Sequence, residues 1–475
     1  MTRSKRPNLL LITTDQQRWD TLGVNGNRVL KTTHLDALAA RGVNFTRAYS
    51  TVPSCIAARR SILTGQHGAT HGMVGYEDGT QYNPIFTLPS LLGDAGYQTQ
   101  LIGKLHQFPQ GKRFGFDHIV LSEQLDYRPS SIYFGRNDYV DWLKVRAGSG
   151  AEPGGHGLGP NSRLARPFHL DEELHQTSFL VHAAIEFLTR RRDPACPWFL
   201  HLSFWAPHPP LVPPKAYWDR YCHRDDLKPV IGGWAPKDRT PKPGLAPDAA
   251  VGPFDAEEIR QTIAGYYASI HHIDNRINHL FERAFQRGSP TYDEPLYVLF
   301  TTDHGEMLGD HHLFRKSLGY EGSAHIPFVL SGRNVEPTAS TSDALVCLED
   351  ILPTLLDLAG VPVPEPIDGR SLAGFVLGDK PATRDVLFGE HSNPFRTHYV
   401  VSGKHKYIWY AGTNEEQLFD LETDPRETTD LSGSSELLAP MRRLLAERVS
   451  KRDDYRYHLE ALKPLAGALP SVFWS

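Results

Sequence analysis

Two segments of the chain repeat one pattern: LLLITTDQ at residues 9–16 and YVLFTTDH at residues 297–304. Each is an apolar run of strand length that ends in Thr-Thr-Asp, and such runs predict strands buried on both faces, as in a parallel sheet. Ligands of open α/β sheets bind beyond the carboxyl ends of the strands. If the two strands are neighbours, four side chains converge at that edge of the sheet: Asp15, Gln16, Asp303 and His304.

These four side chains offer two carboxylates, one amide and one imidazole. A set of mostly oxygen ligands with one imidazole fits a hard divalent cation. An Asp that only caps a loop or a helix is the alternative for either segment taken alone, and the repetition of the pattern favours the metal site. The donor set does not separate calcium from manganese or magnesium.

The chain between the two segments alternates strands with helices, which predicts an α/β domain with a largely parallel sheet. Further strands are predicted at 98–103, 198–205 and 326–330, and helices at 34–40, 56–63, 88–95, 177–191, 255–286 and 348–359. The stretches 107–176 and 209–252 carry no such alternation. We expect them to be irregular insertions that shape a substrate pocket.

The pattern changes at about residue 381. Short strands predicted at 398–401, 406–410 and 417–420 indicate an antiparallel meander in a smaller α+β subdomain. We therefore divide the chain into a catalytic domain, 1–380, and a C-terminal subdomain with a tail, 381–475. The apolar tail at 455–475 fits docking on its own chain or on a neighbouring subunit, which leaves a homo-oligomer open.

Composition excludes several classes of protein. The 475 residues are 40% hydrophobic and 22% charged, with a formal net charge of −5, which is typical of a globular chain and gives no positive excess for nucleic acid or a polybasic membrane surface. Four scattered cysteines form no CxxC pair. The chain starts without a signal-peptide pattern and has no run of roughly 20 apolar residues. We expect a cytoplasmic protein without nucleic-acid or membrane partners.

The segment PSCIAARRSILTG at residues 53–65 predicts a helix that begins near Cys55 and ends at Gly65. A helix N-terminus favours anions, and Arg59 lies one turn later on the same face as Cys55. A guanidinium beside a nucleophile suits an anionic, oxygen-rich substrate. The alternative is a buried structural cysteine.

At these residues the chain resembles the type I sulfatases of the alkaline phosphatase superfamily, whose signature is Cys-x-Pro/Ala-x-Arg followed by Leu-Thr-Gly. Other segments are similar to elements of the same family, and together they cover nearly the whole chain. They are PNL at 7–9 through Asp15, GKLH at 103–106, APHPP at 206–210, DHGEMLGD at 303–310 with Lys316 after it, and LFDLETDPRE at 418–427.

The resemblance implies an alkaline-phosphatase-like fold. Its parts are a large mixed, mostly parallel sheet flanked by helices and a smaller C-terminal α+β subdomain that carries an antiparallel sheet. It also implies a sulfuric ester hydrolase. The implied metal ligands are Asp15, Gln16, Cys55, Asp303 and His304, and the implied catalytic residues are Cys55, Arg59, Lys104, His106, His208 and Lys316.

In that family a maturase oxidises the signature cysteine to formylglycine, and the hydrated aldehyde attacks the sulfur of a sulfate monoester. The resemblance therefore implies a maturase as partner, one divalent metal, Ca²⁺ ahead of Mn²⁺ or Mg²⁺, and a small-molecule or saccharide sulfate ester as substrate. Arg59 would screen the sulfate, and His208 and Lys316 would assist the leaving alcohol. Lys104 and His106 would help to expel sulfate from residue 55.

Three positions depart from the commoner family pattern. Ala57 replaces the commoner Pro, which bears on recognition by a maturase. Gln16 and His304 replace the commoner Asp and Asn, a pair also found in phosphonate monoester hydrolases, which the chain resembles over 304–320, whereas Lys104 with His106 is the sulfatase pattern. Two alternatives stay open: a phosphonate monoester or phosphodiester hydrolase on the same scaffold, and a non-catalytic binder of sulfated ligands if Cys55 is not converted.

Overall fold

The large sheet sits at the centre of the molecule. The computed structural model describes residues 6–123, 136–235, 246–332, 341–378, 383–392 and 396–450. Its strands follow the order β4-β3-β5-β1-β6-β8-β2-β7, and β9 also pairs with β2. The strands are β1 (Asn8–Asp15), β2 (Gly42–Tyr49), β3 (Gln98–Gly103), β4 (His118–Leu121), β5 (Trp198–Pro207), β6 (Leu296–Thr302), β7 (His325–Ile326), β8 (Phe328–Gly332) and β9 (Thr341–Cys347).

Five neighbouring strands, β4, β3, β5, β1 and β6, run parallel, and β2 pairs in parallel with β9. The strand β8 is antiparallel to both β6 and β2, and β7 is antiparallel to β2. The prediction of a mixed, mostly parallel sheet is therefore confirmed.

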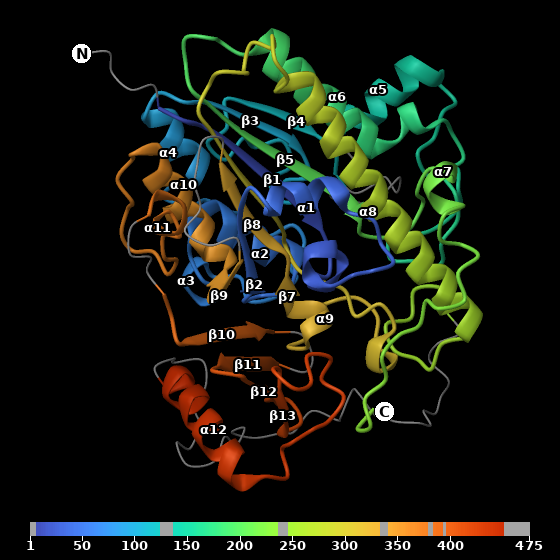
Figure 1. Cartoon of the computed structure of the whole chain (residues 1–475), viewed down its shortest axis with the longest axis vertical. Coiled ribbons are helices and arrows are strands. Elements are labelled where there is room, and N and C mark those ends of the chain that lie inside the picture. The colour runs from blue at the N-terminus through green and yellow to red at the C-terminus, as the bar shows by residue number, and fades with distance from the viewer. Residues whose placement is uncertain are drawn as a thin grey trace.

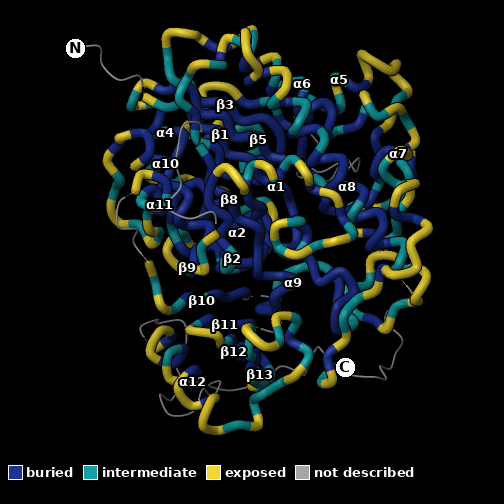
Figure 2. Tube along the Cα trace, viewed as in Figure 1, coloured by how far each residue is buried: buried dark blue, intermediate teal, exposed yellow. Residues whose placement is uncertain are grey.

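Helices cover both faces of this sheet (Figure 1). They are α1 (Thr33–Ala39), α2 (Cys55–Thr64), α3 (Gly68–His71), α4 (Leu88–Asp94), α5 (Asp138–Ala147), α6 (Gln176–Glu186), α7 (Lys215–Trp218), α8 (Ala256–Ala284), α9 (Glu321–Ala324), α10 (Ile351–Ala359) and α11 (Gly374–Leu377). Alternate residues of β1 explain the two layers. Leu9 and Leu11 pack in a cluster with α2, α4 and α10, whereas Leu10 and Ile12 pack with α1, α6 and α8. The central strands β1, β5 and β6 are buried along almost their whole length (Figure 2).

Most predicted elements are found close to their expected bounds. The long helix α8 begins after Asp255, whose carboxylate accepts hydrogen bonds from the backbone N–H groups of Glu257 and Glu258, both at 3.0 Å. The helix predicted at 177–191 ends as α6 at Glu186 and continues as a single π turn over Phe187–Arg191.

The expectation that 107–176 is irregular is wrong in part. The strand β4 lies inside this stretch and extends the parallel sheet beyond β3, and α5 follows it. A strand of four residues, of which only Ile119 and Leu121 are buried, is too short for a periodicity to show, which is why the sequence did not reveal β4. Residues 124–135 of the same stretch lie outside the described residues.

A second, four-stranded antiparallel sheet follows in the order β10-β11-β12-β13, which confirms the predicted C-terminal sheet. Its elements are β10 (Val386–His391), β11 (Thr397–Ser402), β12 (His405–Tyr410), β13 (Glu415–Asp420) and α12 (Ser435–Val449). Helix α12 packs on one face of this sheet, at the end of the molecule shown lowest in Figure 1. The proposed boundary at 380/381 and the tail at 455–475 fall outside the described residues, so the domain division stays a prediction.

A buried ion pair ties the smaller sheet to the larger domain. Lys406 Nζ on β12 lies 2.5 Å from Glu321 Oε1 on α9 and 3.1 Å from Glu427 Oε1. Among the described helices, none combines the length and apolar character needed to cross a bilayer.

Candidate active site

The carboxyl ends of four adjacent parallel strands bring the predicted site residues together. Thr14 of β1 pairs with Thr302 of β6, so Asp15 and Asp303 follow directly at the same edge of the sheet. On the other side of β1 lie β5 and then β3. They deliver His208 and Lys104, respectively, just after their last residues. The expectation that the two repeated segments are neighbours is confirmed.

Four buried side chains form a candidate metal centre. One ligand atom from each of Asp15, Cys55, Asp303 and His304 can be chosen so that all four lie within 4.8 Å of one another. Cys55 Sγ is 3.1 Å from His304 Nε2 and 3.9 Å from Asp15 Oδ1. His304 Nδ1 lies 3.0 Å from the carbonyl oxygen of Gly305, which aims Nε2 at the cluster. Two carboxylates and one imidazole beside residue 55 fit a divalent cation of the hard or intermediate kind.

Cys55 is the first residue of α2, as predicted, and Arg59 points to the same cluster one turn later. Arg59 Nε donates to Asp303 Oδ2 at 3.0 Å and Nη2 donates to Asp15 Oδ2 at 3.1 Å. The remaining nitrogen, Nη1, donates to the hydroxyl oxygen of Ser203 at 2.8 Å. The guanidinium therefore bridges both carboxylates and fixes their separation.

Lys104 adds a second buried cation. Its Nζ lies 2.5 Å from Asp15 Oδ2 and 4.0 Å from the ring centre of Trp205. Burial works against the charge, but Asp15 and Cys55 outweigh it and raise the pKa of Lys104. For Asp15, burial would raise the pKa, yet Lys104 and Arg59 hold the pKa well below its usual value, so the carboxylate stays ionised.

His106 lies two residues further on, in a left-handed backbone conformation with φ of 53°. Glu123 stabilises that turn, because its Oε1 accepts hydrogen bonds from the backbone N–H groups of both Leu105 and His106 at 2.9 Å. His106 Nε2 is 3.8 Å from Asp78 Oδ1. Its interaction with the Cys55 side chain helps to lower the pKa of the thiol.

The side chains of Lys316 and His208 contact each other. Lys316 Nζ lies 2.9 Å from His208 Nε2 and 2.6 Å from Gln16 Oε1. His208 Nδ1 lies 2.7 Å from the carbonyl oxygen of Pro209, which can only accept, so Nδ1 carries the proton and Nε2 accepts from Lys316. Burial, and then the charge of Lys316, lower the pKa of His208 to about 4.

Gln16 is oriented by two partners. Its backbone has φ of 70°, and its backbone N–H donates to Asp303 Oδ1 at 3.1 Å. Its side-chain Nε2 donates to Glu306 Oε2, which turns Oε1 toward Lys316. Gln16 therefore lies beside the four-residue cluster, and its role as a metal ligand stays a prediction.

Positive charge dominates the surroundings of Cys55. Burial would raise the pKa of its thiol, but Lys316, Lys104 and His304 outweigh burial and hold the pKa well below its usual value. A site of this kind stabilises an anion placed next to residue 55.

Four residues that contact the site were not among the predicted ones: Glu123, Ser203, Trp205 and Glu306. Glu306 stands in the motif after Asp303 and His304, and Trp205 ends a predicted strand, so both had a signal in the sequence. Glu123 had none, because it contacts the Lys104–His106 turn only through backbone N–H groups.

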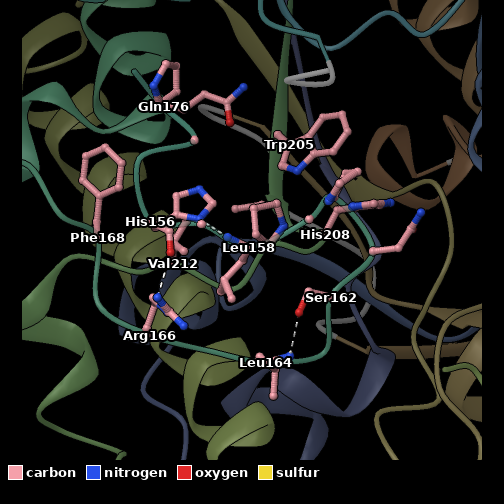
Figure 3. A pocket seen from close by; sticks show the side chains of 18 of the residues that line it. His156, Leu158, Ser162, Leu164, Arg166, Phe168, Gln176, Trp205, His208 and Val212 are labelled. Carbon is pink, nitrogen blue, oxygen red and sulfur yellow. Dashed lines mark hydrogen bonds between the residues drawn. The ribbon is translucent and has the colours of Figure 1, made fainter. Parts of the chain in front are cut away.

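A cavity of about 1000 Å³ adjoins this centre. Trp205 and His208 form the wall that faces the centre, and residues between 153 and 168 form much of the rest (Figure 3). Residues 107–176 and 209–252 were expected to shape a pocket, and they do supply most of the lining.

Comparisons with known proteins agree with this geometry. A family profile described as "Sulfatase" matches residues 7–361, and one described as "N-sulphoglucosamine sulphohydrolase, C-terminal" matches residues 309–454. An arylsulfatase of Clostridium perfringens is 39% identical over 473 residues, which cover 94% of this chain and 95% of that protein.

Two solved structures are similar in fold. The phosphonate monoester hydrolase of Agrobacterium radiobacter superposes with a TM-score of 0.77 at 24% identity, over 94% of this chain and 96% of the other. A protein solved with its substrate D-glucosamine-2-N,6-O-disulfate gives a TM-score of 0.72 at 20% identity, over 95% of this chain and 99% of the other. The alkaline-phosphatase-like fold is confirmed.

Proposed function

The chain belongs to the sulfatase family and is a sulfuric ester hydrolase, and we propose that the buried cluster around Cys55 carries out this hydrolysis. The observation that carries the proposal is the convergence of Asp15, Cys55, Asp303 and His304 within 4.8 Å. Three cationic side chains surround this cluster: Arg59, Lys104 and Lys316. A sulfate monoester is an anion with three non-bridging oxygens, which such a ring of cations can hold.

The family implies one divalent metal. Asp15, Asp303 and His304, with the side chain of residue 55, would hold the ion, and Gln16 would add an amide oxygen. This donor set suits Ca²⁺, Mn²⁺ and Mg²⁺ alike, and it is the family resemblance that favours Ca²⁺. When bound, the ion screens the negative charge of the sulfate group.

The family also uses formylglycine in place of the signature cysteine. We propose that a maturase converts Cys55, even though Ala57 stands where Pro is commoner. The hydrated aldehyde then supplies the hydroxyl that attacks sulfur, which a thiol cannot replace because it has no second hydroxyl for the release of sulfate.

Arg59 and Lys104 act on the sulfate group and on the carboxylates. Arg59 bridges Asp15 and Asp303 and so keeps both oriented toward residue 55. Lys104 keeps Asp15 ionised. His106 interacts with the side chain at position 55, where it can accept a proton from a hydroxyl and so promote expulsion of sulfate.

Lys316 is the proton donor for the leaving alcohol in this proposal. His208 accepts a hydrogen bond from Lys316 through Nε2 and stays neutral, so it orients the ammonium group instead of delivering a proton itself. Lys316 Nζ then stabilises the negative charge that develops on the leaving oxygen.

The substrate is a sulfate ester of an aryl, alkyl or saccharide alcohol. A second candidate activity, on phosphonate monoesters or phosphodiesters, rests on Gln16 and His304, because Gln in place of Asp removes one negative charge from the metal site. Comparing kcat/KM for phenyl sulfate and for a phenyl phosphonate monoester ranks the two activities, and we expect the sulfate to be preferred.

The direct test is sulfate release by protein that is co-produced with a maturase. Turnover should vanish in Cys55→Ala and persist in the matched variant Cys222→Ala, which removes a buried thiol elsewhere. Mass spectrometry of the peptide Ala48–Arg59 reports whether residue 55 is an aldehyde. A thiol that survives co-production, together with binding of sulfated ligands, would instead favour the non-catalytic binder.

A further inference from the structure

The cavity beside His208 lies on the side of the centre from which the alcohol must leave. His208 and Trp205 belong both to the cavity wall and to the centre, where they contact Lys316 and Lys104, respectively. In the proposed function the leaving oxygen faces Lys316. Figure 3 shows His208 and Trp205 among the side chains of the cavity wall, so the rest of the alcohol would extend past His208 into the cavity.

Much of the lining is apolar. Leu158, Leu164, Phe168 and Val212 face the cavity together with Pro153, Pro160 and Pro210. Among the described residues that line it, only Arg166 and Asp248 belong to types with a full charge at neutral pH, and both are exposed. Their opposite signs leave the cavity without a net charge from these two residues.

Several polar side chains of the lining are already hydrogen-bonded within the protein. Ser162 Oγ, His156 Nδ1 and His175 Nδ1 each accept a hydrogen bond from the backbone N–H two residues further along, at 3.1–3.2 Å. Gln176 Nε2 donates to Ser122 Oγ at 2.6 Å. Burial lowers the pKa of His156 to about 4, so this ring is neutral. Groups engaged in this way offer little to the hydroxyls of a sugar.

We propose that this cavity binds the alcohol part of the substrate and selects sulfate esters of bulky, mainly apolar alcohols with more than one ring, such as fused-ring phenols. This inference rests on the proposed function. A volume of about 1000 Å³ exceeds what a single phenyl ring fills, and it lies at the upper end of the roughly 300–1000 Å³ typical of small-molecule pockets. A saccharide would need polar partners, and several polar side chains of the lining already form hydrogen bonds within the protein.

The test compares 2-naphthyl sulfate, phenyl sulfate and glucose 6-sulfate with the maturase-treated, metal-loaded enzyme. The leaving groups of the two aryl sulfates, 2-naphthol and phenol, have similar acidity. The ratio of kcat/KM for the two esters therefore reports binding in the pocket and not the quality of the leaving group. We expect 2-naphthyl sulfate to be preferred over phenyl sulfate by about tenfold or more, because the second ring buries additional apolar area. A preference for glucose 6-sulfate over 2-naphthyl sulfate would overturn the inference.

Two variants examine the lining itself. Leu158→Asn and Val212→Asn should reduce the naphthyl-to-phenyl ratio at least threefold, whereas Val145→Asn, on the exposed face of α5, should leave it unchanged. A ratio that does not respond to either lining variant contradicts the assignment.

A binding measurement tests the pocket assignment independently of the proposed function. Calorimetry with Cys55→Ala should detect 2-naphthyl sulfate, and Leu158→Asn in that background should weaken binding at least threefold. If the aldehyde-bearing enzyme turns over no sulfate ester while this binding persists, the proposed function fails and the pocket stands. If 2-naphthyl sulfate does not bind, the pocket assignment fails.

Discussion

Lys316 Nζ and His208 Nε2 lie 2.9 Å apart, and the tautomer set by the Pro209 carbonyl makes the histidine the acceptor. In the proposed function Lys316 is therefore the group that donates a proton to the leaving alcohol. Lys316→Met should lower kcat/KM by about 10² to 10³ for esters of weakly acidic alcohols and much less for 4-nitrophenyl sulfate, whose leaving group needs no proton. A series of aryl sulfates measures this as a steeper dependence on leaving-group acidity. Lys144→Met, on the exposed face of α5, is the control. An equal loss for all esters would contradict the assigned role.

Glu306 holds the side chain of Gln16 in place. Its Oε2 accepts from Gln16 Nε2, and its Oε1 accepts from the backbone N–H groups of Leu308 and Arg315. Glu306→Gln would place an amide donor against another donor and release Gln16. We expect kcat to fall by about 10² while KM changes little, because misplacement near the reacting atoms affects the transition state most. The control is Glu349→Gln, which removes a buried carboxylate that accepts hydrogen bonds from Thr51 and Ser61 and not from Gln16. This variant should leave kcat unaffected. A change confined to KM would count against the positioning role.

Metal binding should stabilise the fold through the cluster. A ligand at 100 times its Kd adds about 2.7 kcal/mol to the free energy of unfolding. We expect chelation to lower the Tm of the wild-type protein and Ca²⁺ to restore it more effectively than Mg²⁺ or Mn²⁺. Asp303→Asn should abolish this response, and Asp357→Asn, on the exposed face of α10, should keep it. Restoration by Mn²⁺ alone would exclude Ca²⁺ as the resident ion, and a response that survives in Asp303→Asn would exclude the site.

His201 predicts a pH dependence of stability. Its ring is buried between strands, bonds Thr13 Oγ1 at 2.9 Å, and has a pKa lowered to about 3 by burial and by Arg59. Between about pH 3 and pH 6.5 the folded protein keeps this ring neutral, whereas the unfolded chain binds a proton. The free energy of unfolding is therefore unaffected by titration of His201 above about pH 6.5 and decreases as the pH falls toward 3. At pH 5 this loss amounts to about 2 kcal/mol. Urea unfolding gives the free energy of unfolding of wild type and of His201→Gln at pH 7 and pH 5. Between the two pH values this free energy should fall by about 2 kcal/mol more in wild type than in the variant. Identical pH dependence would show that the ring is not held neutral.

The layered α/β fold was predictable because its strands and helices carry their own signals. Leu9 to Ile12 is apolar on both faces, which only a strand covered from both sides explains, and Asp255 marks the start of α8. The strands β2 and β9 were not predicted. The strand β9 mixes buried with partly exposed residues, so its pairing with β2 depends on contacts that become visible only in three dimensions.

The site was predictable to the extent that its residues stand in motifs. Asp15, Cys55, Asp303 and His304 do, and the structure brings them together. Glu123 does not. It accepts hydrogen bonds from backbone N–H groups of the Lys104–His106 turn, and such groups leave no pattern in the sequence because every residue except proline carries one. The hydrogen bond that assigns Lys316 as donor also required coordinates, since it depends on where the carbonyl of Pro209 lies.

The central claim is that an aldehyde at position 55, held among Asp15, Asp303 and His304, performs the hydrolysis. The most direct measurement is the rate of phenyl sulfate hydrolysis in a series of preparations whose aldehyde fraction at residue 55 is set by the level of maturase and read by mass spectrometry. The rate should rise in proportion to that fraction and extrapolate to zero for the thiol form. A rate that does not depend on the fraction, or full activity with an intact thiol, would contradict the account.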